Sequence, residues 1–291
     1  MKDKICVITG ANSGVGKVTA RELAKQGAHV VMVCRNQEKA ERAKEDILRV
    51  CGHDRVDIVL ADLASVQQIR EAAHHINEHY PKIDVLNNNA GLIMGDRRQT
   101  TEDGLEMTFG VNHLAPFLLT HLLLDKVIAS GRGNIINVSS EAHRLASFDL
   151  NDLQYERRWY LGLKAYNLSK LCNILFTREL SKRLSGTNVV TNALHPGAIA
   201  SNFGKGVSGV FGIAMTLSRP FMIGEEKGAQ TSIYLATSEE GYTATGKYFK
   251  NKKAVQPSKD AMNDYNARRL WEISEELLQI EFLPQKKIAS A

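Results

Sequence analysis

Short runs of apolar residues, many of them β-branched, alternate along the chain with longer segments whose apolar residues recur every three or four positions. The short runs predict strands, and the longer segments predict helices. The predicted strands cover residues 5–9, 29–34, 56–60, 83–86, 133–138, 188–194 and 247–249. The predicted helices cover residues 14–26, 37–50, 66–79, 101–129, 163–184 and 227–236, with Ser65 as the cap of the third.

Strands that are apolar nearly throughout and alternate with helices are typical of a parallel sheet covered on both faces. The 291 residues are enough for one large domain and short for two. No linker, repeat or low-complexity segment interrupts the alternation. We therefore expect an α/β fold with a doubly wound parallel sheet in a single domain over residues 1–283, followed by a polar C-terminal tail over residues 284–291.

The composition is that of an ordinary globular protein, with 43% apolar and 24% charged residues. The net charge of +5 comes from scattered basic residues, which favours a small-molecule partner over nucleic acid. No apolar run approaches the roughly 20 residues of a membrane span, and the start has no signal-peptide pattern, so we expect a cytoplasmic protein without an integral span. The four cysteines have no metal-ligand spacing, which predicts reduced thiols and no metal site.

A glycine-rich stretch between the first strand and the first helix reads TGANSGVG over residues 9–16. Glycines let the backbone turn tightly and approach a pyrophosphate, while a helix N-terminus offers amide groups and a positive dipole. Taken alone, the stretch is also compatible with an ordinary strand–helix turn. The candidate cofactor-binding residues in it are Gly10, Asn12, Ser13, Gly14, Val15 and Gly16.

Tyr166 and Lys170 lie four residues apart in a predicted helix and therefore share one face. A lysine ammonium near a phenol lowers the tyrosine pKa, so that the phenol can exchange a proton with a substrate oxygen. Ser139 and Ser140 follow the fifth predicted strand, at the edge of the sheet where doubly wound folds bind ligands. A surface Tyr–Lys pair and a serine that only caps the next segment are the alternative interpretations.

Two asparagine-containing sites complete the set of candidates. The sequence NNAG over residues 88–91 follows the fourth predicted strand, and Asn112 lies inside the long predicted helix. Asparagine is a poor helix former, so Asn112 either has a function or is satisfied by a backbone carbonyl.

Taken in this order and on these elements, the motifs resemble the short-chain dehydrogenase/reductase family from about residue 4 to about residue 250. The glycine stretch matches the family pattern TGxxxGxG, which implies a Rossmann-type sheet. The resemblance also implies a catalytic tetrad of Asn112, Ser140, Tyr166 and Lys170. Ser140 fits better than Ser139, because it follows Asn-Val-Ser where related chains carry N-x-G-S.

The segment between the catalytic serine and tyrosine, residues 141–165, is longer than in many members of the family. Together with Cys34-Arg35 after the second strand and LCNILF over residues 171–176, this insert resembles the retinol dehydrogenase-like branch.

The family resemblance implies direct hydride transfer between a nicotinamide and a substrate carbonyl carbon. Tyr166 would exchange the proton on the substrate oxygen, Ser140 would hold that oxygen, and Lys170 would lower the Tyr166 pKa and bind the nicotinamide ribose. Asn112 would steady a water molecule linked to Lys170. The further cofactor contacts implied by the family are Asp62, Leu63, Asn89, Ala90, Gly91, Pro196, Gly197, Ile199 and Ser201.

The residue after the second strand predicts which nicotinamide cofactor is used. An acidic residue there would accept hydrogen bonds from the adenosine ribose and repel a 2′-phosphate, whereas this chain has Arg35. A guanidinium pairs bidentately with a phosphate, so we expect NADP(H), with Lys17 as a second candidate cation. The alternative is that Arg35 is only a solvent-facing charge.

The substrate is less defined by the sequence. Residues 203–222 are rich in apolar side chains and predict a hydrophobic substrate, although helix packing, a subunit contact and a peripheral membrane contact are alternatives. We thus expect an NADP(H)-dependent oxidoreductase that interconverts an alcohol and a carbonyl. A carbon–carbon double-bond reductase and a non-catalytic cofactor-binding regulatory or scaffold protein are the alternatives. The substrate, the direction of the reaction and assembly into a homo-oligomer stay open.

Overall fold

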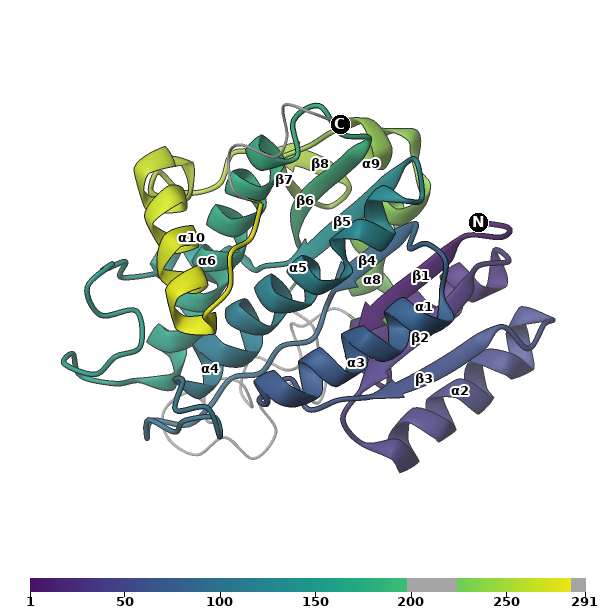
Figure 1. Ribbon diagram of the computed structural model, residues 1–291, viewed down its shortest axis with the longest axis horizontal. Coiled ribbons are helices and arrows are strands. Elements are labelled where there is room, and N and C mark those ends of the chain that lie inside the picture. Colours follow the sequence, from purple (N-terminus) through teal and green to yellow (C-terminus); the bar gives the residue numbers. More distant parts are fainter. Residues whose placement is uncertain (198–223, 284–291) are drawn as a thin grey trace.

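A twisted sheet runs through the middle of the protein, with helices on both faces (Figure 1). The computed structural model describes residues 1–197 and 224–283. Over those residues the sheet has eight strands in the order β3-β2-β1-β4-β5-β6-β7-β8, and only the β7–β8 pair is antiparallel. The strands are β1 Ile5–Thr9, β2 His29–Cys34, β3 Val56–Leu60, β4 Val85–Asn88, β5 Gly133–Val138, β6 Val189–His195, β7 Tyr248–Lys250 and β8 Lys253–Val255.

The helices are α1 Gly14–Lys25, α2 Gln37–Cys51, α3 Val66–His79, α4 Met107–Phe109, α5 Ala115–Ile128, α6 Gly162–Arg183, α8 Glu225–Thr237, α9 Glu239–Thr243 and α10 Asp264–Leu278. Five of the helices, α1, α2, α3, α6 and α8, begin and end within two residues of the predicted positions. Between the helices lie a π-helical turn, Gly110–Leu114, and two 3-10 turns, Glu141–Leu145 and Asp260–Met262. Ser65 caps α3 as predicted, because its hydroxyl accepts a hydrogen bond from the amide of Gln68 at 3.3 Å.

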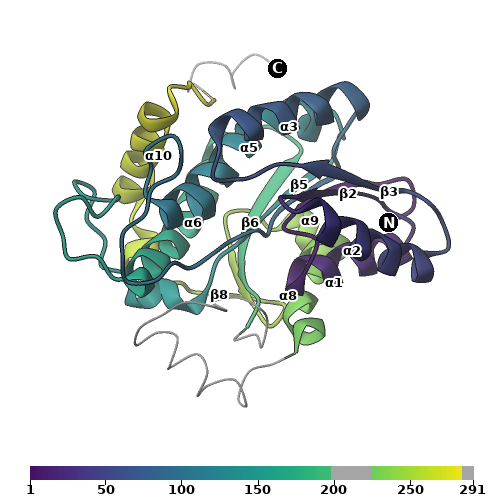
Figure 2. The same cartoon turned by 90° about the horizontal axis from the view of Figure 1, so that it is seen from below.

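Helices cover both faces of the sheet, as the view from below in Figure 2 shows, and successive residues of the inner strands face opposite helix layers. Cys6 and Ile8 pack with Met32 on the side of α1, α2 and α8, whereas Val7 and Val31 pack on the side of α3, α5 and α6. Both faces of the sheet are therefore shielded from water by helices, which explains why these strands are apolar throughout. The predicted doubly wound α/β fold is confirmed, and the predicted tail over residues 284–291 lies outside the described residues.

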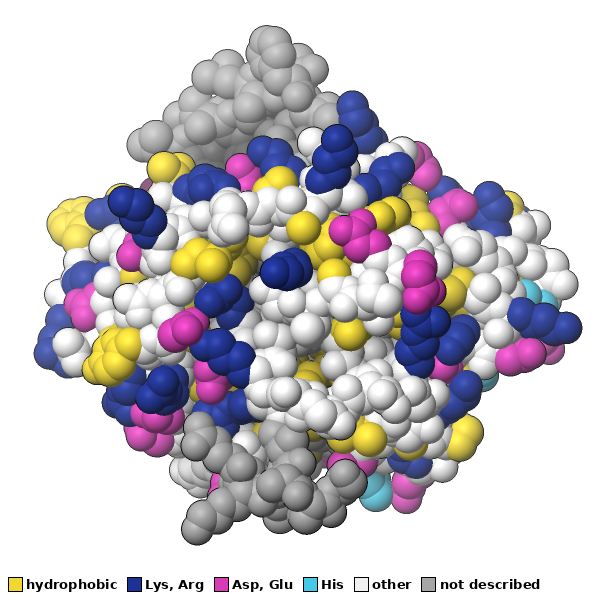
Figure 3. Space-filling model, turned by 90° about the horizontal axis from the view of Figure 1, so that it is seen from above, with side chains coloured by type: hydrophobic (Ala, Val, Ile, Leu, Met, Phe, Trp, Pro, Cys, Tyr) yellow, Lys and Arg dark blue, Asp and Glu magenta, His cyan; other side chains and the backbone are white. Residues whose placement is uncertain are grey.

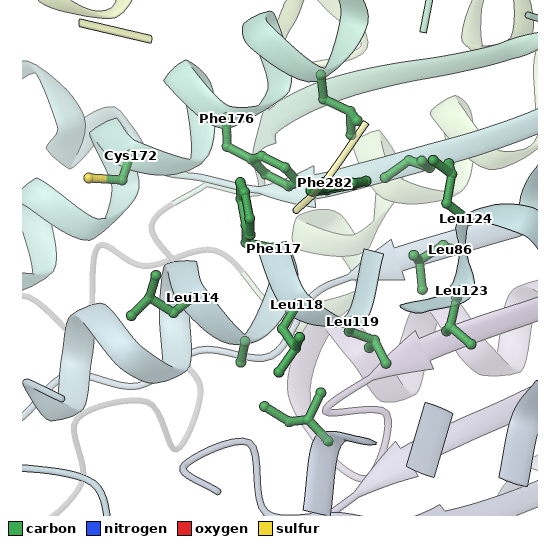
Figure 4. Packing of buried hydrophobic residues seen from close by; sticks show 14 of the residues in the cluster. Leu86, Leu114, Phe117, Leu118, Leu119, Leu123, Leu124, Cys172, Phe176 and Phe282 are labelled. Carbon is green, nitrogen blue, oxygen red and sulfur yellow. The ribbon is translucent and has the colours of Figure 1, made fainter. Parts of the chain in front are cut away.

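The larger of the two main cores, one on each face of the sheet, contains a cluster of aromatic rings between α5, α6 and α10 (Figure 4). Phe117 of α5 lies 5.2 Å from Phe176 of α6 and 4.8 Å from Trp271 of α10, measured between ring centroids. Phe282, which follows α10, stacks on Trp271 at 4.7 Å and is 1% exposed. The C-terminal helix is thus part of the central core.

The order of the strands places a switch point between β1 and β4. The chain moves outward from β1 to β2 and β3, and then returns to β4 on the other side of β1. Ligands of doubly wound sheets bind where the connections diverge in this way, beyond the carboxyl ends of the two strands. Those ends are Thr9 and Asn88, which directly precede the glycine turn and the segment Asn89–Gly91.

Two predicted elements need correction. The long helix begins at Met107 and not at Thr101, because Gly104 takes a left-handed φ of 79° and the Glu106 carboxylate caps the amide of Thr108 at 3.0 Å. The fourth strand covers Val85–Asn88 and not residues 83–86, since its pairing with β1 starts at Val85 and its pairing with β5 continues to Asn88. Pairing with the neighbouring strands therefore extends β4 to the polar residues Asn87 and Asn88, which the hydrophobic pattern did not include.

The last part of the chain contains the predicted strand β7 and three elements that the sequence analysis missed, β8, α9 and α10. Strands β7 and β8 form a hairpin whose turn residues, Asn251 and Lys252, both have left-handed φ angles of 51° and 62°. Helix α10 is capped by Asn263, whose side chain accepts a hydrogen bond from the amide of Asn266 at 3.1 Å. Its buried face, which includes Leu270 and Trp271, has regular helical spacing.

One helical stretch in the described part of the chain, Met107–Ile128, is long and apolar enough to cross a membrane, and 83% of its apolar window is buried inside the protein. Its side chains pack against the sheet, α3 and α6, which is typical of a core helix. On the face shown in Figure 3, lysine and arginine side chains lie among acidic and apolar ones and form no continuous basic stripe. All four cysteines are free, and Cys51 is the one that is not fully buried.

Candidate active site

The glycine turn after β1 has a shape that larger residues would disrupt. Gly10 and Gly14 take left-handed φ angles of 66° and 57°. A Cβ atom on Gly16 would overlap the carbonyl of Gly10 and the side-chain amide of Asn89. The start of α1 therefore approaches the loop after β4 closely, as a turn that receives a pyrophosphate requires.

The loop after β4 is fastened to the end of β1 by three hydrogen bonds. The hydroxyl of Thr9 accepts from the amides of Asn89 at 3.0 Å and Ala90 at 2.9 Å, and the Asn89 side chain donates to the Thr9 carbonyl at 2.8 Å. The two predicted cofactor segments thus form one surface. Thr9, which is 2% exposed, is a residue that sequence reasoning did not select, although it opens the glycine motif.

Lys170 reaches this surface from the opposite side. Its side chain is 3% exposed, and its Nζ donates to the carbonyl of Val138 at the end of β5 at 3.1 Å. A Cβ atom on Gly91 would lie 3.2 Å from that Nζ, so glycine at position 91 leaves room for the ammonium. Burial lowers the pKa of Lys170 to about 8, which still leaves most of the lysine protonated at neutral pH.

Tyr166 and Ser140 meet at the same edge of the sheet. A hydrogen bond joins their side chains, and Lys170 Nζ lies 5.5 Å from the centroid of the tyrosine ring. Burial raises the pKa of Tyr166 to about 12, and the bond from Ser140 opposes part of that rise. The direction differs from the lowering expected from the sequence, because burial outweighs the stabilisation of the phenolate in this geometry.

The two adjacent serines have different surroundings. Ser139 is 1% exposed and donates to the backbone carbonyl of Lys170 at 2.6 Å, which ties the end of β5 to α6. Ser140 is partly exposed, faces Tyr166 and caps the 3-10 turn Glu141–Leu145, called the Ser140 turn below. The structure therefore places Ser140, and not Ser139, beside the tyrosine, as the family pattern implied.

Asn112 lies in the π-helical turn, a distortion that is frequent at functional sites. Its buried side chain pairs with the backbone of Leu92 through two hydrogen bonds of 2.8 Å and donates to the Ser169 hydroxyl at 3.0 Å. Asn112 thus holds the segment after Gly91 against α6, next to Lys170. Its expected contact with a water molecule stays a prediction.

The insert between Ser140 and Tyr166 folds into an ordered loop. Asp152, which is 6% exposed, accepts hydrogen bonds from the amides of Glu156 at 2.7 Å and Arg158 at 2.9 Å and from Arg158 Nε at 3.1 Å. Tyr160 donates to Glu106, which caps α4, at 2.8 Å. The loop returns to the start of α6, so Tyr166 meets Ser140 in spite of the long sequence between them.

The adenosine end of the expected cofactor site contains a cation that faces solvent. The Arg35 side chain is 70% exposed, and its guanidinium lies 3.5 Å from the Asp62 carboxylate. Lys17 is directed elsewhere, because it pairs with Asp46 of α2 at 2.5 Å. Leu63 is partly buried against the larger core.

The nicotinamide end is described only in part. Pro196 and Gly197 follow β6, and Gly197 has a left-handed φ of 108°. Ile199, Ser201 and the apolar stretch over residues 203–222 lie outside the described residues. His195 at the end of β6 accepts a hydrogen bond from the amide of Glu141 at 3.3 Å, and burial lowers its pKa to about 4.

The assembled site supports acid–base chemistry. It combines a phenol and a hydroxyl that share a hydrogen bond with an ammonium beside the phenol, next to a glycine turn that opens onto a helix N-terminus. Within residues 1–197 and 224–283, no group of three potential metal-ligating side chains is present.

A family model described as short chain dehydrogenase matches residues 4–209. The chain belongs to the short-chain dehydrogenase family. It is 45% identical over 283 residues to human retinol dehydrogenase 13, covering 96% of this chain and 85% of that protein. It is 42% identical to mouse retinol dehydrogenase 12, covering 96% of this chain and 87% of that protein.

Solved structures share the fold of this chain. A protein of Mycobacterium paratuberculosis has a TM-score of 0.77 at 33% identity and covers 97% of this chain and 95% of its own. A short chain dehydrogenase from Escherichia coli CFT073, solved in complex with NADPH, shares the fold with a TM-score of 0.69 at 21% identity, over 87% of this chain and 98% of its own. This short-chain dehydrogenase is thus of the retinol dehydrogenase-like branch, an oxidoreductase that interconverts an alcohol and a carbonyl with a nicotinamide cofactor.

Proposed function

We propose that this short-chain dehydrogenase uses NADP(H) to interconvert a hydrophobic alcohol and its carbonyl compound in the cytoplasm. The observation that carries the proposal is the hydrogen-bonded pair of Ser140 and Tyr166, with the Lys170 ammonium 5.5 Å from the tyrosine ring. Ser140 follows β5, the strand next to β4, and the Lys170 ammonium lies beside Gly91 in the loop after β4, so the group is next to the switch point between β1 and β4.

The residues present fit a dinucleotide. The close approach of Gly16 to Gly10 and Asn89 forms a cradle that a Cβ atom would fill, and Gly91 leaves room beside Lys170. When bound, a nicotinamide cofactor supplies or accepts the hydride. Arg35 would hold the 2′-phosphate, and Lys170 would hold the nicotinamide ribose.

The protein side chains provide the proton chemistry. In carbonyl reduction, Tyr166 donates its phenolic proton to the substrate oxygen while Ser140 donates a hydrogen bond to the same oxygen. The Lys170 ammonium stabilises the phenolate that remains. Asn112 keeps the segment after Gly91 against α6, so that Lys170 stays beside the tyrosine.

The proposed apolar substrate has support from the relatives and from the helix that carries the tyrosine. The relatives named above are retinol dehydrogenases, and retinol is an apolar alcohol. Leu163 lies three residues before Tyr166 on the same face of α6 and is 38% exposed, which offers an apolar surface beside the phenol.

Steady-state assays of the purified protein test this function. All-trans-retinal, an aliphatic aldehyde and a polar sugar aldehyde are each offered with NADPH and with NADH, and the alcohol product is identified. We expect turnover that is faster with NADPH and that favours the apolar aldehydes. Absence of turnover with all three classes, or a preference for the sugar aldehyde, would contradict the proposal.

The proposed location has its own test. The one described helix with the length and apolarity of a membrane span is used in the core of the protein. We expect the protein in the supernatant after high-speed centrifugation without detergent. Recovery only from the membrane pellet would contradict a cytoplasmic location.

A further inference from the structure

The backbone of Ser140 is held by a residue that the chemistry above does not use. His143 lies in the Ser140 turn, is 1% exposed and makes two hydrogen bonds to the Ser140 carbonyl. Its backbone amide donates at 3.1 Å, and its ring Nδ1 lies 2.6 Å from the same oxygen. Since a carbonyl only accepts, Nδ1 must carry a proton.

The other ring nitrogen faces a donor. His143 Nε2 accepts from the backbone amide of Ser258 at 3.0 Å. An amide only donates in this geometry, so Nε2 must be unprotonated, and the two partners together select the neutral Nδ1–H form of the ring. The ring also packs edge-on against Tyr248 at 5.0 Å between centroids.

The charged groups around the ring are paired with one another. Glu141 accepts from Tyr248 at 2.9 Å and from Lys250 at 3.0 Å, and Arg144 donates to the carbonyl of Gln256 at 2.6 Å. Burial and the nearby Arg144 lower the pKa of His143, while the bond to Ser140 and Glu141 raise it by less. The ring is therefore neutral at physiological pH, in agreement with its partners.

These contacts connect the catalytic serine to a distant part of the chain. Ser258 lies 115 residues after His143, in the segment between β8 and the 3-10 turn Asp260–Met262. At its other end, the connection runs from the His143 ring through the Ser140 backbone to the Ser140 hydroxyl, which is bonded to Tyr166.

We propose that neutral His143 is a positioning residue, which fixes the backbone of Ser140 so that the serine hydroxyl faces Tyr166 and the substrate oxygen. It acts through Ser140 and touches none of the reacting atoms. The proposal rests on the proposed catalytic role of Ser140. A displaced hydroxyl costs transition-state stabilisation even when the fold is intact, because the donor must be aligned with the developing charge.

Two amide substitutions separate the bonds of the ring. In His143→Asn, the side-chain amide nitrogen occupies the place of Nδ1 and keeps the bond to the Ser140 carbonyl. In His143→Gln, the amide lies one bond further out, keeps a partner for Ser258 and loses the bond to Ser140. The two variants are matched in polarity, and their thermal unfolding midpoints and NADPH dissociation constants are measured alongside kcat for retinal reduction.

We expect His143→Gln to lower kcat roughly tenfold, with NADPH affinity unchanged, and His143→Asn to stay within about threefold of the wild type. The same two substitutions are made in a Ser140→Ala background. There, His143→Gln should cause less than about a twofold further loss, because its effect requires the serine hydroxyl.

A kcat for His143→Gln equal to that of the wild type would overturn the proposal. Equal losses in His143→Asn and His143→Gln, or an undiminished loss in the Ser140→Ala background, would also overturn it, since the histidine would then act through the fold. The proposed function has a separate readout. Wild-type turnover by Ser140→Ala alone would remove Ser140 from the chemistry, whatever the His143 variants do.

Discussion

Arg35 offers the sharpest test of cofactor choice, because the two nicotinamide cofactors differ only at the adenosine 2′ position. A charge-assisted hydrogen bond contributes about 1.5–3 kcal/mol, and each 1.4 kcal/mol corresponds to about tenfold in affinity. The Arg35 side chain is 70% exposed and lies 3.5 Å from the Asp62 carboxylate, which competes with a phosphate. Both features place the expected preference for NADPH at the lower end of the range, about tenfold in kcat/KM.

Arg35→Asp should reverse that preference, because the new carboxylate repels the phosphate and accepts hydrogen bonds from ribose hydroxyls. Asp62→Asn should instead strengthen the preference for NADPH, since it removes the negative charge that competes with the phosphate for Arg35. The assay is the ratio of kcat/KM for NADPH to that for NADH at low and high salt. Salt should reduce the ratio of the wild type, because screening weakens the phosphate contact.

Arg42→Asp is the matched control for the charge change. Arg42 is 74% exposed on α2 and pairs with Glu38, so the substitution alters the net charge by the same amount away from the expected phosphate. Its cofactor ratio should equal that of the wild type. Equal use of both cofactors by the wild type, or the same shift in Arg35→Asp and Arg42→Asp, would refute the reasoning.

Three further outcomes follow from the geometry of the site. Tyr166→Phe should lower kcat by roughly 10² or more and leave the NADPH dissociation constant nearly unchanged, because only the proton donor is lost; near-normal turnover would contradict its role. Lys170→Ala should weaken both turnover and NADPH binding, and full affinity measured by fluorescence quenching would exclude the ribose contact. Glu141→Gln tests pH-dependent stability, since the bonds from Lys250 and Tyr248 hold the Glu141 pKa at about 2, below its ordinary value of 4.5. The stabilisation by Glu141 is therefore complete above about pH 5 and is lost as the pH falls towards 2. The difference in unfolding free energy between wild type and variant should shrink over that range. A constant difference in acid denaturation curves would contradict this prediction.

The parts of the fold that the sequence predicted best are bounded by strong local signals. Strands β1, β2, β3 and β5 have the predicted bounds, because glycine or charged residues delimit each apolar run. Helix α10 was missed although its buried residues Ala267, Leu270, Trp271, Ser274 and Leu278 have helical spacing. The residues directly before it do not have the hydrophobic pattern of a strand, so the alternation of strands and helices did not predict a helix there. The break in the long helix depends on Glu106, whose capping role requires the folded loop around it.

The sequence also predicted only part of the candidate active site. The motif residues Ser140, Tyr166 and Lys170 do come together, because each follows from its place on a strand end or a helix face. The direction of the Tyr166 pKa shift was wrong, since burial is a property of the whole fold and does not show in the spacing of tyrosine and lysine. The pairing of Lys17 with Asp46 joins two helices 29 residues apart and has no local signal.

The aromatic cluster around Trp271 bears on where the folding unit of this protein ends. The family model stops at residue 209, yet Trp271 and Phe282 fill the space between α5 and α6. A chain shortened to the family-matched length would expose Phe117 to water and lose the burial of two large aromatic side chains, about 3–5 kcal/mol for each when such a residue is truncated in a core. That loss is comparable to the whole stability of a typical domain. The segment matched by the family model and the cooperative folding unit are therefore different lengths of chain, and a protease that removes the last helix should release an unfolded polypeptide in place of a smaller enzyme.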